Sequence, residues 1–342
     1  MKVFATTAIS QTVGTYLPLF KKLAGQDRFR VHRLTENPDS ADAILFLDGH
    51  QHYRDISLTA ISEHPLVRQN RRKALIYSEL DQPWCAMPGL YVSMPKRSFD
   101  WRRQRACSYL LLLNTFVAAD DNESVTPSLL FSYMGRRCHP VRDRILKLRH
   151  QRAHIEDTTA IDFFGDSSDE VIRHKHRYAS VIRNSKFVLC PRGGGLASFR
   201  LFETMAAGRV PVIISNGWVP PLGPVWDQAT IRVKESQVKH VASIVESYES
   251  AFESMSQAAR SAWEQWFAPD VIFHRMIESC AEILSNHTGR ETPWPRLLNS
   301  RYLYLMARSL KWRLKEQVTK AVREVEVPRG SSRSIEHSDA IQ

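Results

Sequence analysis

The sequence predicts an α/β protein made of two doubly wound domains. Short apolar segments typical of buried strands alternate with segments of helical spacing along most of the 342 residues. This alternation stops at the polar stretch Asp120–Ser124, which ends before Thr126-Pro127, and then restarts. The length also suggests two domains, at about 150 residues each. Two successive βα arrays in one chain favour two parallel sheets with helices packed on their faces.

In the first array, the apolar run Asp42–Asp48 (DAILFLD) is typical of a strand buried on both faces of a parallel sheet. Shorter β-rich runs predict four more strands, and apolar residues at helical spacing predict three helices. These further strands are expected at Lys2–Thr6, Arg30–Arg33, Lys73–Tyr77 and Leu90–Met94, and the helices at Gly14–Gly25, Ile56–Asn70 and Arg102–Asn114.

In the second array, Pro140 predicts the first turn of a helix over Pro140–His150, because proline is preorganised for that position. Gly208 predicts the end of a helix over Ala197–Ala207, since glycine adopts the left-handed conformation that often follows a helix. Other strands are expected at Leu129–Met134, Ile161–Phe164, Lys186–Cys190, Val210–Ile214 and Thr230–Val233, and other helices at Asp169–Asn184, Glu235–Ser250 and Ala251–Leu284.

Composition excludes several classes of protein. Apolar residues make up 43% and charged residues 24%, close to globular averages and unlike disordered, collagen-like or coiled-coil chains. No run of apolar residues is long enough to span a membrane, and no signal peptide follows Met1. The five cysteines are scattered without zinc spacing, which favours free thiols in a reducing compartment. We therefore expect a cytoplasmic protein.

The net charge is +11, which favours anionic partners such as nucleic acid, phosphorylated substrates or anionic lipid. A basic helix with interleaved aromatic and leucine residues is expected over Arg296–Val325. It predicts a peripheral association with the inner face of a membrane. Alternatively, its apolar stripe packs on the body of the protein and its basic face is solvated. Residues 328–342 form a polar tail that we expect to be disordered.

The segment Lys186–Leu222 is the most informative for function. A predicted buried strand ends at Cys190, three glycines follow at 193–195, and a helix is expected to begin near Ser198. Glycines let the backbone approach a ligand closely, and a helix N-terminus offers free N–H groups and positive potential to a diphosphate. The spacing matches neither the Walker A motif nor GxGxxG, so a tight strand-to-helix turn without a ligand is the alternative.

Arg200 and Glu203 lie three residues apart near the start of that helix and so share one face. Arginine matches phosphate oxygens in fork geometry, and a carboxylate accepts hydrogen bonds from a ribose diol. Together they predict a nucleoside diphosphate site. The alternative is an ion pair on the protein surface.

These residues resemble the signature of the exostosin family, glycosyltransferase family 47. The similarity runs through Pro191-Arg192-Gly193, Leu196–Glu203, Gly208–Ser215 and Asn216-Gly217-Trp218, and Leu129–Arg142 resembles the family's strand, glycine and following arginine. The resemblance implies a GT-B fold of two facing Rossmann-like domains, with the acceptor side in residues 1–122 and the nucleotide-sugar site in 123–290. The residue pattern adds the basic helix in 291–327 and the tail in 328–342.

The resemblance also implies an inverting transfer of a hexosyl or glucuronyl group. The donor would be a UDP-sugar, and the acceptor a glycan or lipid-linked saccharide in polysaccharide biosynthesis. The family's nucleotide-binding positions carry over to Arg142, Tyr178, Arg200 and Glu203, and Arg192, Gly193 and Ser198 would add phosphate or loop contacts. Animal heparan-type members carry arginines where this chain has Gly194 and Gly195, which weakens the glucuronate interpretation.

We expect no metal cofactor, because the chain lacks the Asp-x-Asp motif of GT-A enzymes, and Glu79-Leu80-Asp81 is the nearest variant. Inverting transfer needs a general base, expected at a strand end of the first domain. Candidates are Asp48, Glu79 and Asp81, together with His50 and His52, and the sequence does not rank them.

Two other functions stay open at this point. The first is a non-catalytic exostosin-like partner subunit of an active transferase: the presence of Arg200 and Glu203 argues against it, but the unidentified base leaves it open. A nucleic-acid-binding protein would explain the net charge, but the basic residues are spread through the chain and the aromatics form no RNP-like pattern. We therefore expect no nucleic-acid partner.

Overall fold

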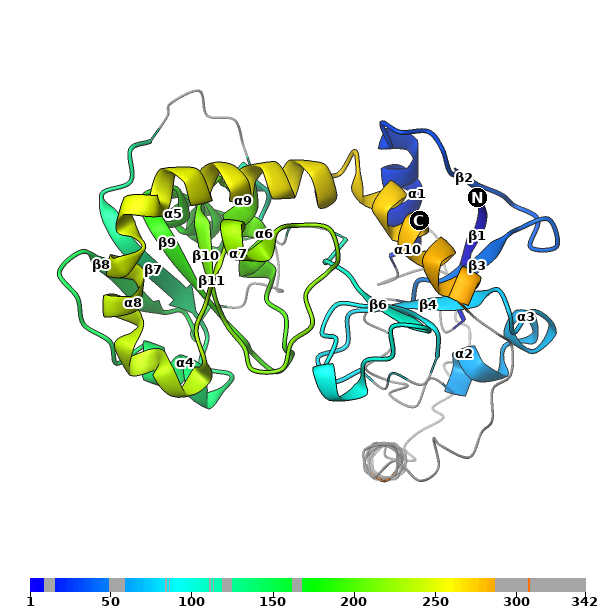
Figure 1. Cartoon of the computed structure of the whole chain (residues 1–342), viewed down its shortest axis with the longest axis horizontal. Helices are drawn as coiled ribbons and strands as arrows, with labels where there is room; N and C mark the ends of the chain where they lie inside the picture. The colour runs from blue at the N-terminus through cyan, green and yellow to red at the C-terminus, as the bar shows by residue number, and fades with distance from the viewer. Residues whose placement is uncertain are drawn as a thin grey trace, which may run out of the picture. The chain divides into compact units, whose positions relative to one another are not determined.

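The computed structural model describes residues 1–8, 16–48, 59–83, 85, 87–110, 112, 114–118, 125–161, 168–286 and 307. Within them, two parallel sheets account for all the named strands (Figure 1). The predicted α/β class with two doubly wound sheets is therefore confirmed. The basic helix predicted over 296–325, the tail and the Asp120–Ser124 linker lie outside the described residues, apart from residue 307, so the membrane association stays a prediction.

The first sheet has the strand order β2-β1-β3-β4-β5-β6 among the described residues, with every pairing parallel. Its strands are β1 (Lys2–Thr6), β2 (Arg33–Leu34), β3 (Ala43–Phe46), β4 (Ala74–Ser78), β5 (Gly89–Tyr91) and β6 (Gln104–Ala106). The helices of this part are α1 (Leu17–Gln26), α2 (Thr59–Glu63), α3 (Pro65–Gln69), η2 (Lys96–Ser98) and η3 (Thr115–Ala118).

The second sheet has the order β11-β10-β9-β7-β8 in the described part of the chain, again all parallel. Its strands are β7 (Leu129–Gly135), β8 (Ala153–Asp157), β9 (Ser185–Pro191), β10 (Val210–Ile214) and β11 (Ile231–Arg232). The helices are α4 (Pro140–Ile145), α5 (Asp169–Arg183), α6 (Phe199–Ala206), α7 (Trp226–Ala229), η4 (Glu235–His240), α8 (Val241–Ser247), η5 (Glu249–Ala251), α9 (Phe252–Trp266) and α10 (Ile272–Asn286).

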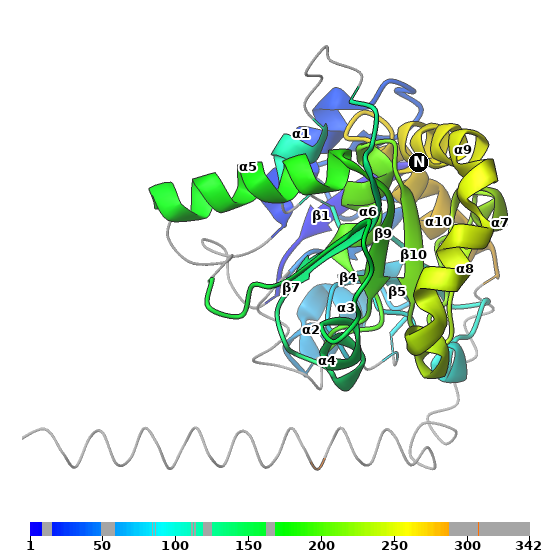
Figure 2. The same ribbon diagram turned by 90° about the vertical axis from the view of Figure 1, so that its left-hand side faces the viewer.

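Both faces of each sheet are buried, which explains the continuous apolar runs in the sequence. In β9, Phe187 and Leu189 face one core cluster while Val188 and Cys190 face another. Successive side chains of a strand point to opposite faces, so such a strand must be apolar at every position. Figure 2 shows α5 and α8 on opposite sides of the second sheet.

The helix predicted over Arg102–Asn114 is wrong. The segment forms the short strand β6, and the described residues between β6 and η3 are not helical. The Oη of Tyr77, which donates its proton to Glu79, accepts a hydrogen bond from Leu110 N (3.1 Å). A backbone N–H that a helix would pair internally is therefore bound by a side chain of β4.

Other elements differ in their bounds. The strand predicted at Ile161–Phe164 stays a prediction, because residues 162–164 lie outside the described residues. The strand β8 (Ala153–Asp157) was not predicted. Residues 153–157 mix polar and apolar side chains because β8 is an edge strand. Long predicted helices are divided: Pro65 begins a new helix after α2, and Phe267–Val271 separates α9 from α10. The helix that starts at Pro140 ends early, at Ile145.

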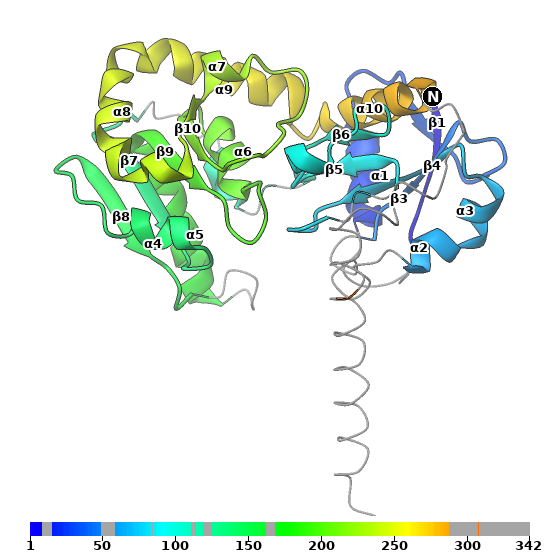
Figure 3. The same cartoon turned by 60° about the horizontal axis from the view of Figure 1, so that its bottom comes forward.

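Helix α10 follows the second array in sequence, but it packs on the first sheet. It contacts α1, β5 and β6 (Figure 3). Arg105 in β6 is almost fully buried and pairs with Glu282 of α10, with 2.8 Å between Nε and Oε2. The chain therefore returns to its N-terminal half before the described residues end. No helix among these residues has the length and hydropathy to cross a membrane.

Candidate functional site

A cavity of about 360 Å³ lies at the carboxyl ends of β7 and β9. The chain continues from β7 to the edge strand β8 on one side, and from β9 to β10 on the other. Ligands of open α/β sheets bind at such a switch point, because the two connections leave in opposite directions. The volume is within the range of small-molecule sites. Its lining includes residues 134–138 after β7, 193–195 after β9 and 197–200 at the start of α6.

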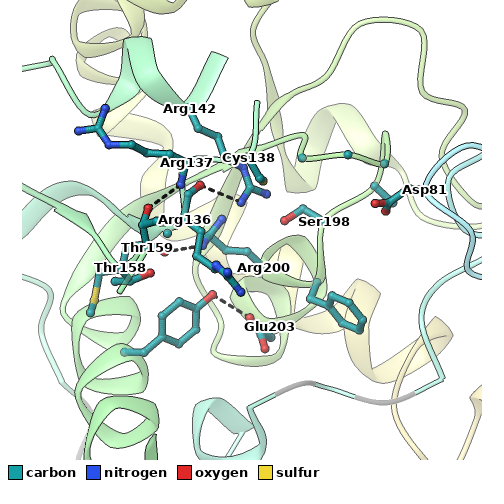
Figure 4. A pocket seen from close by; sticks show the side chains of 18 of the residues that line it. Asp81, Arg136, Arg137, Cys138, Arg142, Thr158, Thr159, Ser198, Arg200 and Glu203 are labelled. Carbon is teal, nitrogen blue, oxygen red and sulfur yellow. Dashed lines mark hydrogen bonds between the residues drawn. The ribbon is translucent and has the colours of Figure 1, made fainter. Parts of the chain in front are cut away.

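Arg200 and Glu203 lie on α6 and line this cavity, as the sequence predicted (Figure 4). They are not surface residues, because only 8% of Arg200 and 3% of Glu203 is exposed. Among the described residues, no ion pair joins them. The alternative of a surface ion pair is therefore wrong.

Arg200 is held by the strand beside it. Its Nη2 donates to Met134 O, and its guanidinium carbon lies 4.8 Å from the centre of the Tyr133 ring. Its Nε is buried and has no hydrogen-bond partner among the described residues. A buried donor without a partner is costly, so a ligand oxygen in the cavity would satisfy it.

Glu203 accepts hydrogen bonds from Tyr178 Oη (2.8 Å) and from the backbone N–H of Asn114 (3.0 Å). Burial raises the pKa of this carboxyl group, while these two hydrogen bonds and Arg200 oppose the rise. Each carboxylate oxygen still has one acceptor position, so Glu203 can accept a further hydroxyl donor. Tyr178 lines the cavity beside it, as the family resemblance implied.

Arg142, at the start of α4, joins the two loops that flank the cavity. It donates Nε to Arg192 O (2.9 Å), Nη2 to Pro191 O (3.4 Å) and Nη1 to Arg136 O (3.4 Å). Its guanidinium group therefore fixes the glycine loop, residues 193–195, and its positive charge remains in the cavity lining.

The other predicted loop contacts divide into two groups. Gly193 and Ser198 line the cavity, and Ser198 is the N-cap residue of α6 with no side-chain capping bond. The Arg192 side chain is not part of the lining. It folds over the glycine loop, with 3.4 Å from Nη2 to Gly194 O.

Of the candidate bases, Asp81 lies in the cavity lining, and Figure 4 shows it at a different end from Glu203. The N–H of Gly195 donates to its carboxylate. Burial raises the pKa of Asp81 from the usual aspartate value, and Arg142, the Gly195 bond and Arg192 oppose that rise. The side chain comes from the loop after β4, in the first array, and lies against the glycine loop of the second.

The other candidate bases are placed elsewhere. Glu79 accepts from Tyr16 Oη (2.5 Å) and Tyr77 Oη in a buried cluster, and burial raises its pKa. Asp48 is fully buried after β3 and accepts from Ala8 N (2.7 Å). Neither lines the cavity. His50 and His52 lie outside the described residues.

Several lining residues gave no signal in the sequence. Tyr109 belongs to the segment wrongly predicted as helix, and its ring stacks on Phe199 with 3.6 Å between ring centres. Thr158 and Thr159 follow β8, an edge strand without an apolar run. Only their placement in the fold brings these side chains to the site.

Residues 118–248 match the Exostosin GT47 domain. Exostosin-1 of Bos taurus is 33% identical over 128 residues, which cover 36% of this chain and 17% of that protein. Exostosin-1 of Drosophila melanogaster is 38% identical over 97 residues, 27% of this chain and 13% of that protein. Residues 118–248 are therefore similar to an exostosin domain. The match spans about a sixth or less of the curated relatives' length.

Solved structures give a weaker similarity. A glycosyltransferase from Rickettsia africae aligns with a TM-score of 0.39 at 10% identity, covering 83% of this chain and 99% of that one. HepE of Anabaena in complex with UDP aligns with a TM-score of 0.37 at 8% identity, covering 82% and 99%. The segment that matches the Exostosin GT47 domain contains Arg142, Tyr178, Arg200 and Glu203, whereas Asp81 precedes it.

The contact between Asp81 and the glycine loop can be tested by a double-mutant cycle. A Cβ at Gly194 would overlap the Asp81 carboxylate but would lie 3.7 Å from its Cβ. We expect Gly194→Ala to lower the free energy of unfolding by about 1–3 kcal/mol, as overpacking does. In an Asp81→Ala background, Gly194→Ala should lower the free energy of unfolding by less than about 0.5 kcal/mol. Chemical denaturation measures both values.

Gly25→Ala serves as the matched control, because a Cβ there meets nothing within 4 Å. It should leave stability unchanged or slightly increased, since alanine favours helix. Equal costs of Gly194→Ala in the two backgrounds would show that Asp81 does not lie against Gly194.

Proposed function

We propose that this protein is an inverting glycosyltransferase that moves a sugar from a UDP-sugar to a hydroxyl of a glycan or lipid-linked saccharide. One observation carries the proposal. A single cavity contains the start of α6, Arg200, Glu203 and, at a different end, Asp81. The first three suit a nucleoside diphosphate, and the last suits a general base. The match of residues 118–248 to the Exostosin GT47 domain supports the same assignment.

The donor would lie along α6. Its diphosphate would accept hydrogen bonds from Arg200 and from N–H groups at residues 193–198, where the helix dipole favours negative charge. Its ribose would donate to Glu203. The sugar would then extend past the glycine loop toward Asp81, away from the nucleoside.

Asp81 would act as the base. Its carboxylate takes the proton of the acceptor hydroxyl as that oxygen bonds to the anomeric carbon, and the bond from this carbon to the diphosphate breaks. UDP leaves with the bonding electrons, and the configuration at the anomeric carbon is inverted. Arg200 and Arg142 would stabilise the charge that develops on the leaving diphosphate. The raised pKa of Asp81 suits a group that must accept a proton.

The first prediction concerns the nucleotide. Arg200→Ala should weaken UDP binding by about 1.5–3 kcal/mol, because a charge-assisted hydrogen bond to phosphate is lost. Calorimetry measures the affinity. Arg232→Ala is the control, since Arg232 is exposed on β11 and does not line the cavity. Arg200→Lys keeps the charge but loses the fork geometry, so its UDP affinity should lie between those of Arg200→Ala and Arg232→Ala. Unchanged UDP affinity in a folded Arg200→Ala protein would refute this role.

A second prediction concerns the base. Asp81→Asn should reduce kcat by about 10²–10⁴-fold without weakening UDP binding, because the group acts on the acceptor. The base must be ionised, so turnover should fall as pH decreases through the Asp81 pKa. Since burial raises that pKa, this acidic limb should lie above the usual aspartate range.

Asp39→Asn, at an exposed aspartate of the first array, should keep both the rate and the acidic limb. An acidic limb that persists at the same pH in Asp81→Asn would assign the base elsewhere.

The third prediction is that transfer needs no metal. Arginines surround the proposed diphosphate position, and no group of three metal-ligating side chains lines the cavity among the described residues. Turnover at 25 °C should survive excess EDTA. Loss of turnover that Mn²⁺ restores would contradict this mechanism.

A panel of UDP-sugars, scored by UDP release with glycan and lipid-linked acceptors, identifies the donor and separates hexosyl from glucuronyl transfer. If the protein binds UDP but releases no UDP from any UDP-sugar with any acceptor, the result would instead support the non-catalytic partner subunit.

A further inference from the structure

Two histidines and a glutamate meet where α10 packs on the first array, close to the end of α1 (Figure 1). His32 lies between α1 and β2, while His274 and Glu278 lie on α10. The Nε2 of His32 is 2.6 Å from Oε1 of Glu278. The rings of His32 and His274 stack with 4.8 Å between their centres. One nitrogen or oxygen atom from each of the three residues lies within 4.8 Å of the others.

The two imidazole rings are buried, yet not all their nitrogens are bound. His32 is 8% and His274 is 9% exposed. The Nδ1 of His274 has no hydrogen-bond partner among the described residues. The Nδ1 of His32 lies 3.1 Å from the main-chain nitrogen of Met1, which leaves Nε2 to face Glu278. Unbound ring nitrogens in a buried position are costly unless something binds them.

Two carboxyl groups lie near the histidines. Asp27 is 4% exposed, and its Oδ1 has no partner in the described part of the chain. Its charge and that of Glu278 both act on His274, and the charge of Arg275 opposes them. The guanidinium carbon of Arg275 lies 4.1 Å from the centre of the Trp266 ring and 5.2 Å from that of Phe29, and its Nε donates to Gln265 O (3.1 Å).

We propose that His32, His274 and Glu278 bind one zinc ion, which ties α10 to the first array. His274 and Glu278 are four residues apart and so project from one face of the helix. Two imidazoles and one carboxylate are a common zinc ligand set, with water as the fourth ligand. Tetrahedral zinc bonds of about 2.0–2.2 Å place ligand atoms roughly 3.3–3.6 Å apart. Nε2 of His32 and Oε1 of Glu278 are closer than that, at 2.6 Å, and rotation of the half-exposed Glu278 side chain adjusts the spacing.

This zinc site is separate from the proposed transfer site. None of its three ligands lines the cavity at the glycine loop. Glu278 instead lines another cavity of about 190 Å³, beside Pro221, Leu222 and Trp266, which gives the ion a path from solvent. The zinc ion therefore stabilises the packing of α10, and its removal leaves the chemistry of transfer intact.

The test uses the full chain, treated with chelator and then dialysed into metal-free buffer. Titration with ZnCl₂ should show one ion per chain by calorimetry, and saturating zinc should raise the melting temperature. Glu278→Gln should weaken zinc binding by at least about tenfold, because it removes one of three ligands. His274→Phe should abolish zinc binding. It keeps an aromatic ring stacked on Phe29, whose ring centre lies 4.1 Å from that of His274.

Two controls exclude other zinc ligands. His176→Phe replaces a histidine that also stacks on a phenylalanine, Phe116, but lies outside the cluster. Cys138→Ser removes the exposed thiol. Both should bind zinc as the unchanged protein does, and Co²⁺ bound in place of zinc should show no thiolate charge-transfer band. The absence of zinc binding, or unchanged affinity in Glu278→Gln and His274→Phe, would overturn the proposal.

Discussion

The burial of α6 on every side is the constraint on which the candidate site depends. Every residue from Arg200 to Ala206 is buried, although the helix contains an arginine and a glutamate near its start. Charged groups are almost never buried without partners, so the surrounding elements must supply them. Met134 supplies a carbonyl, Tyr178 a hydroxyl and Asn114 a backbone N–H. The strand β7, the helix α5 and the segment before η3 are thereby held around one end of the cavity.

The glycine loop connects this part of the second array to the first array through direct contacts. Side chains at 194 and 195 would occupy the space that the Asp81 carboxylate now fills. The indole N–H of Trp218 donates to Val92 O (3.0 Å), and the backbone N–H of Lys96 donates to Gly217 O (2.7 Å). These bonds join the loops after β5 and β10. The position of Asp81 in the cavity thus follows from backbone contacts between the two arrays, not from any property of its neighbours in sequence.

Helix α10 completes the first array from the far end of the described chain. Its apolar residues Phe273, Met276, Ile277 and Cys280 enter the same core cluster as Phe20, Leu45 and Leu90. The hydrophobic core of the first array is therefore complete only with α10, the helix that follows α9. The pair of buried Arg105 with half-exposed Glu282 has the same origin, because its partners are 177 residues apart in the sequence.

The sequence by itself determined the α/β class, most strands and the placement of Arg200 and Glu203 at a helix start after a glycine turn, because these follow from local spacing and strand burial. It could not predict the segment 102–114, where Tyr77 of β4 binds a backbone N–H that a helix would have used. Nor could it rank Asp48, Glu79 and Asp81, three carboxylates that all follow strands of one sheet. What tertiary structure decided is which of the three lines the cavity: the contact with Gly194 and Gly195 places Asp81 there, and neither Asp48 nor Glu79.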